Sequence, residues 1–126
     1  MTPFGECMRR IRRERGITLK EMAEGVGVSS AYLSALEHGK RGRPGWHLLQ
    51  RLLSYLNIIW DEAEEVVRLA RISHPRVTID TSGLDPAATE LANRLADDVS
   101  KLDKADIEAM LAVLDRRKRR KPRSTK

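Results

Sequence analysis

Two short segments near the N-terminus repeat apolar residues at the spacing of a helix. In the first segment, four apolar residues fall at i, i+3, i+4 and i+7 and so share one helix face: Leu19, Met22, Ala23 and Val26. Thr18 and Glu21 form a capping-box pattern, in which both side chains satisfy backbone N–H groups at a helix start. Gly27 follows, and glycine readily takes the left-handed conformation that ends a helix. The pattern predicts a helix over residues 19–26.

The second segment begins directly after this glycine. Ser29 is a typical N-cap for a helix from Ser30 to about His38, and Gly39 is placed to end it. Val28 lies between the two helices and can pack into a core beneath the corner. A helix, a tight glycine-containing turn and a second helix together predict a helix-turn-helix motif.

Three further helical patterns surround this motif. One covers residues 4–15, a second begins at residue 45 or 46 and ends near 56, and a third follows Trp60 and closes before Pro75. Cys7 lies on the inward face of the first of these helices. A buried, packing thiol is expected there rather than a redox or metal site, because the chain has one cysteine.

Residues 75–83 are expected to form a linker or a short strand. Residues 76–80 alternate polar and β-branched side chains, which is a weak strand signal with no second strand nearby. Such a strand could pair with its copy in a second subunit, or the segment could pack as extended chain on the helices.

Beyond this linker the pattern becomes helical again. Asp85 is a typical N-cap and Pro86 suits the first helical position, so a helix is expected from there to about Lys101. Asp103 begins another helix, and the two form an amphipathic αα-hairpin over residues 84–115.

The hairpin is too small to bury its own apolar stripes. It is therefore expected to lie on the N-terminal domain or on another subunit. We favour a homodimer, formed by eight apolar residues: Leu91, Leu95, Val99, Leu102, Ile107, Met110, Leu111 and Leu114. Residues 116–126 contain no apolar side chain and are expected to be a disordered basic tail.

Charge is distributed unevenly along the 126 residues. The net charge is +4 over residues 1–45, −6 over residues 46–115 and +8 over residues 116–126. A basic N-terminal region that coincides with a helix-turn-helix indicates a polyanionic partner. The single cysteine and the absence of an apolar N-terminal run of signal-peptide length favour a cytoplasmic protein without a membrane span.

Four segments of the motif region carry a resemblance to a known family. These are Leu-Lys-Glu-Met-Ala-Glu (19–24), Gly-Val-Ser (27–29), Tyr-Leu-Ser-Ala-Leu-Glu (32–37) and Gly-Lys-Arg-Gly-Arg-Pro (39–44). Together they resemble the phage-repressor (Xre/Cro-like) helix-turn-helix family. The resemblance covers roughly residues 4–71 and implies a five-helix repressor-like DNA-binding domain over residues 1–74. With the helical hairpin expected from the apolar pattern of residues 84–115, which the resemblance does not cover, the expected fold is all-α.

The resemblance also implies which residues contact double-stranded DNA, because the second motif helix of this family enters the major groove. The residues expected to face bases are Ser29, Ser30, Ala31, Tyr32, Ser34 and Ala35. The residues expected to contact phosphates are Lys20, Lys40, Arg41 and Arg43. Several of the base-facing side chains are short and give few bidentate contacts, so direct base readout should be modest. The Tyr32 side chain could contact a base or a phosphate, or lie across the helix onto the domain.

One structural ion pair is implied by the same resemblance. Arg12 is expected to pair with Glu37 and so to lock the first helix to the third, ahead of any phosphate contact.

The function expected from these features is that of a sequence-specific transcriptional regulator, a dimeric repressor on an inverted-repeat operator. One alternative is an antitoxin whose C-terminal region holds a toxin, and another is a module that binds nucleic acid or protein without sequence preference. An enzyme is not expected, and neither is a cofactor or a metal, because the three histidines lack metal-ligand spacing and no Gly-rich phosphate loop is present.

Overall fold

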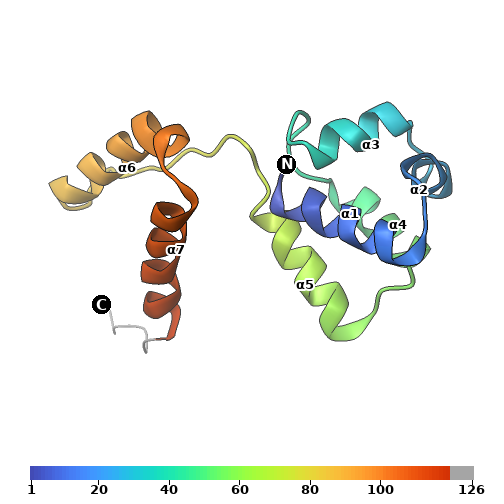
Figure 1. Ribbon diagram of the computed structural model, residues 1–126. Helices are drawn as coiled ribbons and strands as arrows, with labels where there is room; N and C mark the ends of the chain where they lie inside the picture. Colours follow the sequence, from blue (N-terminus) through green and yellow to red (C-terminus); the bar gives the residue numbers. More distant parts are fainter. Residues whose placement is uncertain (120–126) are drawn as a thin grey trace. The chain divides into compact units, whose positions relative to one another are not determined.

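The computed structural model describes residues 1–119, which form α-helices and one short 3₁₀ helix without any strand. The predicted all-α fold is confirmed. The chain divides into two units, one covering Met1–Thr78 and the other beginning at Ile79. The first holds helices α1 to α5 and the second holds α6 and α7 (Figure 1).

The five helices of the first unit follow the predicted order, with these bounds: α1 Pro3–Arg15, α2 Leu19–Val26, α3 Ser30–Glu37, α4 Trp46–Tyr55 and α5 Trp60–Arg71. Helix α2 has the predicted bounds. Helix α3 ends one residue before the expected His38, whose ψ of 3° departs from helical geometry.

Side-chain caps start the first three helices. The Thr2 hydroxyl accepts a hydrogen bond from the Gly5 amide at 3.0 Å, and the Ser29 hydroxyl accepts one from the Tyr32 amide at the same distance. Thr18 and Glu21 make both hydrogen bonds of the capping box, at 2.9 and 3.0 Å. These caps satisfy N–H groups that the first helical turn leaves without a backbone partner.

The core of this unit is mainly aliphatic. Helix α1 packs against α3 and α5, and α2 packs against α3 and α4. Its largest fully buried apolar side chains are Phe4, Met8, Met22, Leu33, Leu36, Leu52, Leu56 and Val66. Cys7 is also buried among them, which confirms its predicted packing position. Burial of this apolar surface is the main force that holds the helix-turn-helix against its neighbours.

Residues 76–80 form no strand. Val77 is 72% exposed and Ile79 is 59% exposed, so the segment is not buried against helices either. An alternating sequence favours a strand, but a strand is stable only when a neighbouring strand accepts and donates its backbone hydrogen bonds. Residues 76–80 have no such neighbour among the described residues.

The second unit contains α6 Pro86–Asp98, the 3₁₀ helix η1 Val99–Lys101 and α7 Lys104–Arg119. The expected helix to Lys101 thus tightens into a 3₁₀ turn after Asp98. Helix α7 continues to Arg119, so the predicted disordered tail is wrong for its first four residues, and residues 120–126 lie outside the described part of the chain. None of the described helices is long and apolar enough to cross a membrane.

Candidate nucleic-acid interface

The corner between α2 and α3 has the geometry of a helix-turn-helix. Gly27 has φ of 80°, and its amide donates to the Glu24 carbonyl at 3.3 Å. The next amide, that of Val28, donates to the Ala23 carbonyl at 3.0 Å while its side chain packs against the core. Glycine adopts a positive φ with little strain, so Gly27 favours this turn.

The expected base-facing residues divide by exposure. Ser29, Ser30 and Ala31 are exposed at the start of α3, whereas Tyr32, Ser34 and Ala35 are half-buried. The exposed end is therefore the N-terminal turn, where unpaired backbone N–H groups and the positive end of the helix dipole also lie. These short side chains allow the N-terminal turn of α3 to approach a DNA groove closely, but they can make few hydrogen bonds to base edges.

The Tyr32 ring does not project freely from α3. It is half-buried and packs against the core of the first unit. The Arg41 guanidinium lies over the ring at 5.9 Å from its centroid. This position corresponds to the expectation that Tyr32 lies across the helix onto the domain, and it brings together two of the residues singled out in the sequence.

The expected phosphate contacts lie on two elements. Lys40, Arg41 and Arg43 are exposed on the loop that follows α3, and Lys20 is exposed on α2. The loop is tied to α3 by a hydrogen bond from the Lys40 amide to a carbonyl in the last turn of that helix, at 2.8 Å. Three exposed cations are therefore carried on backbone anchored to the motif, an arrangement suited to phosphate oxygens.

Arg12 and Glu37 form the ion pair that connects α1 to α3. Arg12 Nη2 donates to Glu37 Oε1 at 2.7 Å, and the two side chains are 13% and 2% exposed. Arg12 Nε and Glu37 Oε2 are buried without a hydrogen-bond partner among residues 1–119. Burial raises the pKa of Glu37 above its ordinary value of 4.5, although the neighbouring Arg12 guanidinium lowers it.

Backbone contacts that the sequence did not predict hold α3 on the side of α1. The Thr2 amide donates to the Glu37 carbonyl at 3.1 Å, and a Cβ on Gly5 would lie 2.1 Å from that same carbonyl oxygen. Ser73 adds a link from beyond α5, since its hydroxyl accepts from the Phe4 amide at 2.8 Å. Glycine inside a helix is unfavourable unless another segment packs closely against its backbone. Gly5 in α1 was therefore the sequence signal for this contact.

The residues expected at a dimer interface belong to the second unit. Six are exposed, and Leu95 and Leu102 are half-buried. The six exposed residues are Leu91, Val99, Ile107, Met110, Leu111 and Leu114. No residue between 79 and 118 is fully buried, so the apolar stripes of α6 and α7 are not covered within this unit.

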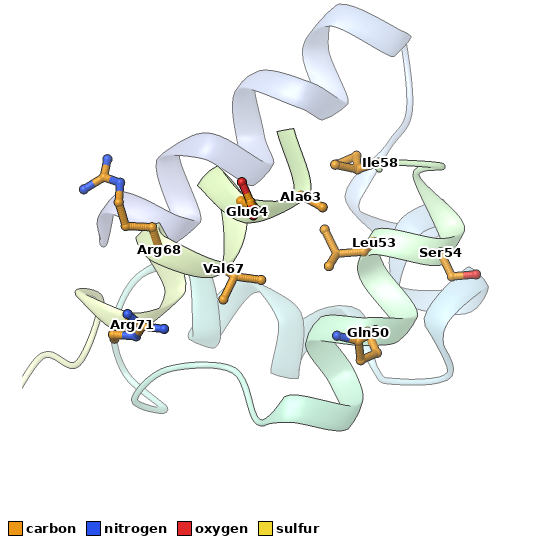
Figure 2. A pocket seen from close by; sticks show the side chains of 9 residues that line it. All are labelled: Gln50, Leu53, Ser54, Ile58, Ala63, Glu64, Val67, Arg68 and Arg71. Atoms are coloured by element: carbon orange, nitrogen blue, oxygen red, sulfur yellow. The ribbon is translucent and has the colours of Figure 1, made fainter. Parts of the chain in front are cut away.

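A hollow of about 560 Å³ lies between α4 and α5 (Figure 2). Its apolar lining residues include Leu53, Ile58 and Val67, and its polar lining residues include Glu64 and Arg71. None of the lining residues belongs to α2, α3 or the loop after α3. In the described part of the chain, no group of three or more His, Cys, Asp or Glu side chains could hold a metal ion.

The N-terminal half of the chain is similar in sequence to known helix-turn-helix proteins. Residues 3–64 match the family model described as a helix-turn-helix domain. The chain is 38% identical over 61 residues to the uncharacterized HTH-type transcriptional regulator RghRB of Bacillus subtilis, which is 48% of this chain and 44% of that protein. It is 39% identical over 61 residues to the HTH-type transcriptional repressor RghR of the same organism, covering 48% of this chain and 45% of that protein.

A third relative is the HTH-type transcriptional regulator SinR of Bacillus subtilis, 32% identical over 55 residues, or 44% of this chain and 50% of that protein. The matched segment thus spans about half the length of the curated relatives. Among solved structures, a SinR protein/SinI protein complex aligns with 93% of this chain and 99% of its own, with a TM-score of 0.43 and 25% identity.

Proposed function

Because the domain formed by residues 3–64 belongs to the Xre-like helix-turn-helix family of transcriptional regulators, we propose that this chain is a sequence-specific repressor. In this proposal it binds double-stranded DNA in the cytoplasm as a homodimer, on an inverted-repeat operator. It represses by covering a promoter. The chemistry proposed is binding alone, without a catalytic step.

The observation that carries the proposal is the exposed N-terminal turn of α3 together with three exposed cations on the loop that follows the same helix. Ser29, Ser30 and Ala31 are exposed at that turn, and Lys40 and Arg43 are exposed on the loop tied to the same helix. We propose that the turn enters the major groove while Lys20 and the loop cations contact phosphates on either side. The half-buried Ser34 and Ala35 then stand at the edge of the contact.

Because α3 carries short side chains, one copy of the domain supplies limited direct readout. Two copies joined through α6 and α7 contact half-sites about 34 Å apart, so that geometry adds specificity. The exposed leucines of α6 and α7 support this arrangement, since they leave apolar surface for a second subunit.

Footprinting on the DNA upstream of the protein's own coding region tests the proposal. A protected region with two-fold symmetry is expected, and protection should weaken when Lys40 and Arg43 are both replaced by alanine. Absence of any protected site at concentrations that saturate random DNA would count against sequence-specific repression.

The second candidate function is that of an antitoxin-type regulator that holds a toxin on α6 and α7. The same uncovered apolar residues favour it, because a partner protein could cover them instead of a second copy. Co-purification of a small protein encoded by the neighbouring gene, at fixed stoichiometry, would distinguish this candidate from the homodimer.

A further inference from the structure

The loop after α3 carries an arginine back to the start of the recognition helix. Arg41 follows α3 in sequence, yet its guanidinium carbon lies 5.9 Å from the centroid of the Tyr32 ring, which belongs to the first turn of α3. Cation–π attraction extends to about 6 Å from a ring centroid. The long cationic side chain thus stands beside a helix end whose own exposed side chains, Ser30 and Ala31, are short.

The ring side of this contact is held in place. The Ser29 hydroxyl accepts from the Tyr32 amide at 3.0 Å, which fixes the backbone of the first turn. The side chain is half-buried and packs against the core of the first unit. These contacts are made within the chain itself.

The arginine side is constrained by the backbone of the loop. Gly39 has φ of 79° and Gly42 has φ of 81°, so left-handed glycines stand on either side of the Lys40–Arg41 pair. The Lys40 amide donates to the Ala35 carbonyl at 2.8 Å, and Pro44 is buried at the far end of the loop. The Arg41 side chain extends from this loop to a position over the Tyr32 ring.

A flexible arginine loses rotamer freedom when it binds a phosphate, and that loss opposes binding. A guanidinium already held over a ring by cation–π attraction loses less, because part of the ordering is present before DNA arrives. An arginine over an aromatic ring can still donate hydrogen bonds to phosphate oxygens.

From this geometry we infer that Tyr32 is a positioning residue: its ring holds the Arg41 guanidinium beside the first turn of α3 for a backbone phosphate, and the ring contacts no base. The inference rests on the proposed DNA-binding function and gives Tyr32 a role that acts through Arg41. It removes Tyr32 from the residues that discriminate between base pairs.

The test is a double-mutant cycle in the full chain. Tyr32→Phe keeps the ring, Tyr32→Leu keeps apolar packing but removes the π face, and Arg41→Ala removes the cation. Affinity is measured against the duplex selected by the wild-type protein and against a random duplex, over a range of salt concentrations. Thermal unfolding of each variant reports whether the domain still folds.

Tyr32→Phe should bind like wild type, and Tyr32→Leu should weaken binding about two- to fivefold on both duplexes alike. In the Arg41→Ala background the same leucine change should have no further effect. Arg41→Ala should lower the salt slope by about one unit. As a matched control, Tyr32→Leu should remain additive with Arg43→Ala, since among the described residues Arg43 makes no cation–π contact with the ring.

The inference is overturned if Tyr32→Leu still weakens binding in the Arg41→Ala background, or if Tyr32→Phe changes the preference between duplexes. Either result would place Tyr32 on a base or a phosphate directly. If Tyr32→Leu unfolds the domain, a change in base preference by Tyr32→Phe alone still overturns the inference. If the wild-type protein binds no duplex at all, the proposed DNA-binding function is overturned. That result differs from the two results that overturn only the role of Tyr32.

Discussion

At the scale of single residues, a buried ion pair is one of the contacts that hold α3 against α1. Glu37 is 2% exposed and closes α3, and Arg12 reaches it from α1 at 2.7 Å. Two charges taken from water are costly unless each keeps its partner, so the pair is sensitive to the loss of one member. Removing Arg12 strands a carboxylate in the core, whereas removing both charges does not.

Replacing Arg12 by methionine should therefore lower the free energy of unfolding at neutral pH by about 3–5 kcal/mol. The double variant Arg12→Met with Glu37→Gln should recover most of that loss, because no unpaired charge remains. Urea unfolding followed by circular dichroism measures both changes. Equal destabilisation by the single and the double variant would contradict a charge-pairing role.

The pair also predicts a pH dependence. The pKa of Glu37 is raised in the folded protein by burial, above the ordinary value of 4.5 that applies to the unfolded chain. The Glu37 carboxyl group therefore binds a proton more tightly in the folded state than in the unfolded state. Its contribution to stability is complete below pH 4.5 and is lost as the pH rises through the folded pKa.

Glu37→Gln cannot titrate at this position. The stability of wild type relative to Glu37→Gln should consequently fall as pH rises from below 4.5 through the folded pKa. Urea midpoints measured for both proteins across that range check the sign. A relative stability that rises with pH would show that Arg12 outweighs burial.

At the scale of elements, close backbone packing orients α1 against α3. A Cβ at Gly5 would lie 2.1 Å from the Glu37 carbonyl oxygen, so the contact depends on the missing side chain. Such a contact involves backbone on both sides and cannot be relieved by a rotamer change.

Gly5→Ala should for this reason cost about 1–3 kcal/mol of stability or more, despite the better helix propensity of alanine. It should weaken DNA binding as well, because α3 must shift. Gly45→Ser is a matched control, since no atom lies within 4 Å of a Cβ there and serine is a good N-cap. Differential scanning calorimetry of both variants is the measurement, and equal melting temperatures would refute the packing argument.

The same elements show what a sequence can predict. Thr18, Glu21, Gly27 and Ser29 act through residues three or four positions away, so the sequence alone sufficed for the bounds of α2 and the start of α3. The contacts of Gly5 and Ser73 join distant segments, 69 residues apart for the Phe4–Ser73 hydrogen bond. No local pattern specifies such a pairing, and these contacts were not predicted.

At the scale of the whole molecule, the first unit has a full core and the second has none. Apolar stripes predicted on α6 and α7 are present, but no residue between 79 and 118 is fully buried. The spacing of apolar residues indicates which face of a helix is buried by packing. It does not indicate whether the same chain, a second copy or another protein covers that face. Residues 76–80 form no strand within the single chain for a related reason, because an alternating pattern cannot supply a neighbouring strand.

If these stripes join two subunits, charges placed on them should separate the subunits. Leu91→Asp combined with Leu111→Asp should convert a dimer to a monomer in light-scattering chromatography. Both leucines are more than half exposed, so the helices lose little packing within the chain. Affinity for a two-half-site duplex should fall by at least about 100-fold, because the second contact is no longer intramolecular.

Glu108→Gln provides the control, since that carboxylate is exposed on α7. It should leave both mass and affinity unchanged. A wild-type protein that is already monomeric in the presence and absence of operator DNA would contradict the dimer.

Selection of binding sites from a pool of random duplexes by the full chain tests the central claim most directly. We predict enrichment of an inverted repeat with half-sites centred about 34 Å apart, and loss of that enrichment when Lys40 and Arg43 are replaced by alanine. A pool that remains random after repeated rounds, although it is retained by the protein, would contradict sequence-specific binding through α3.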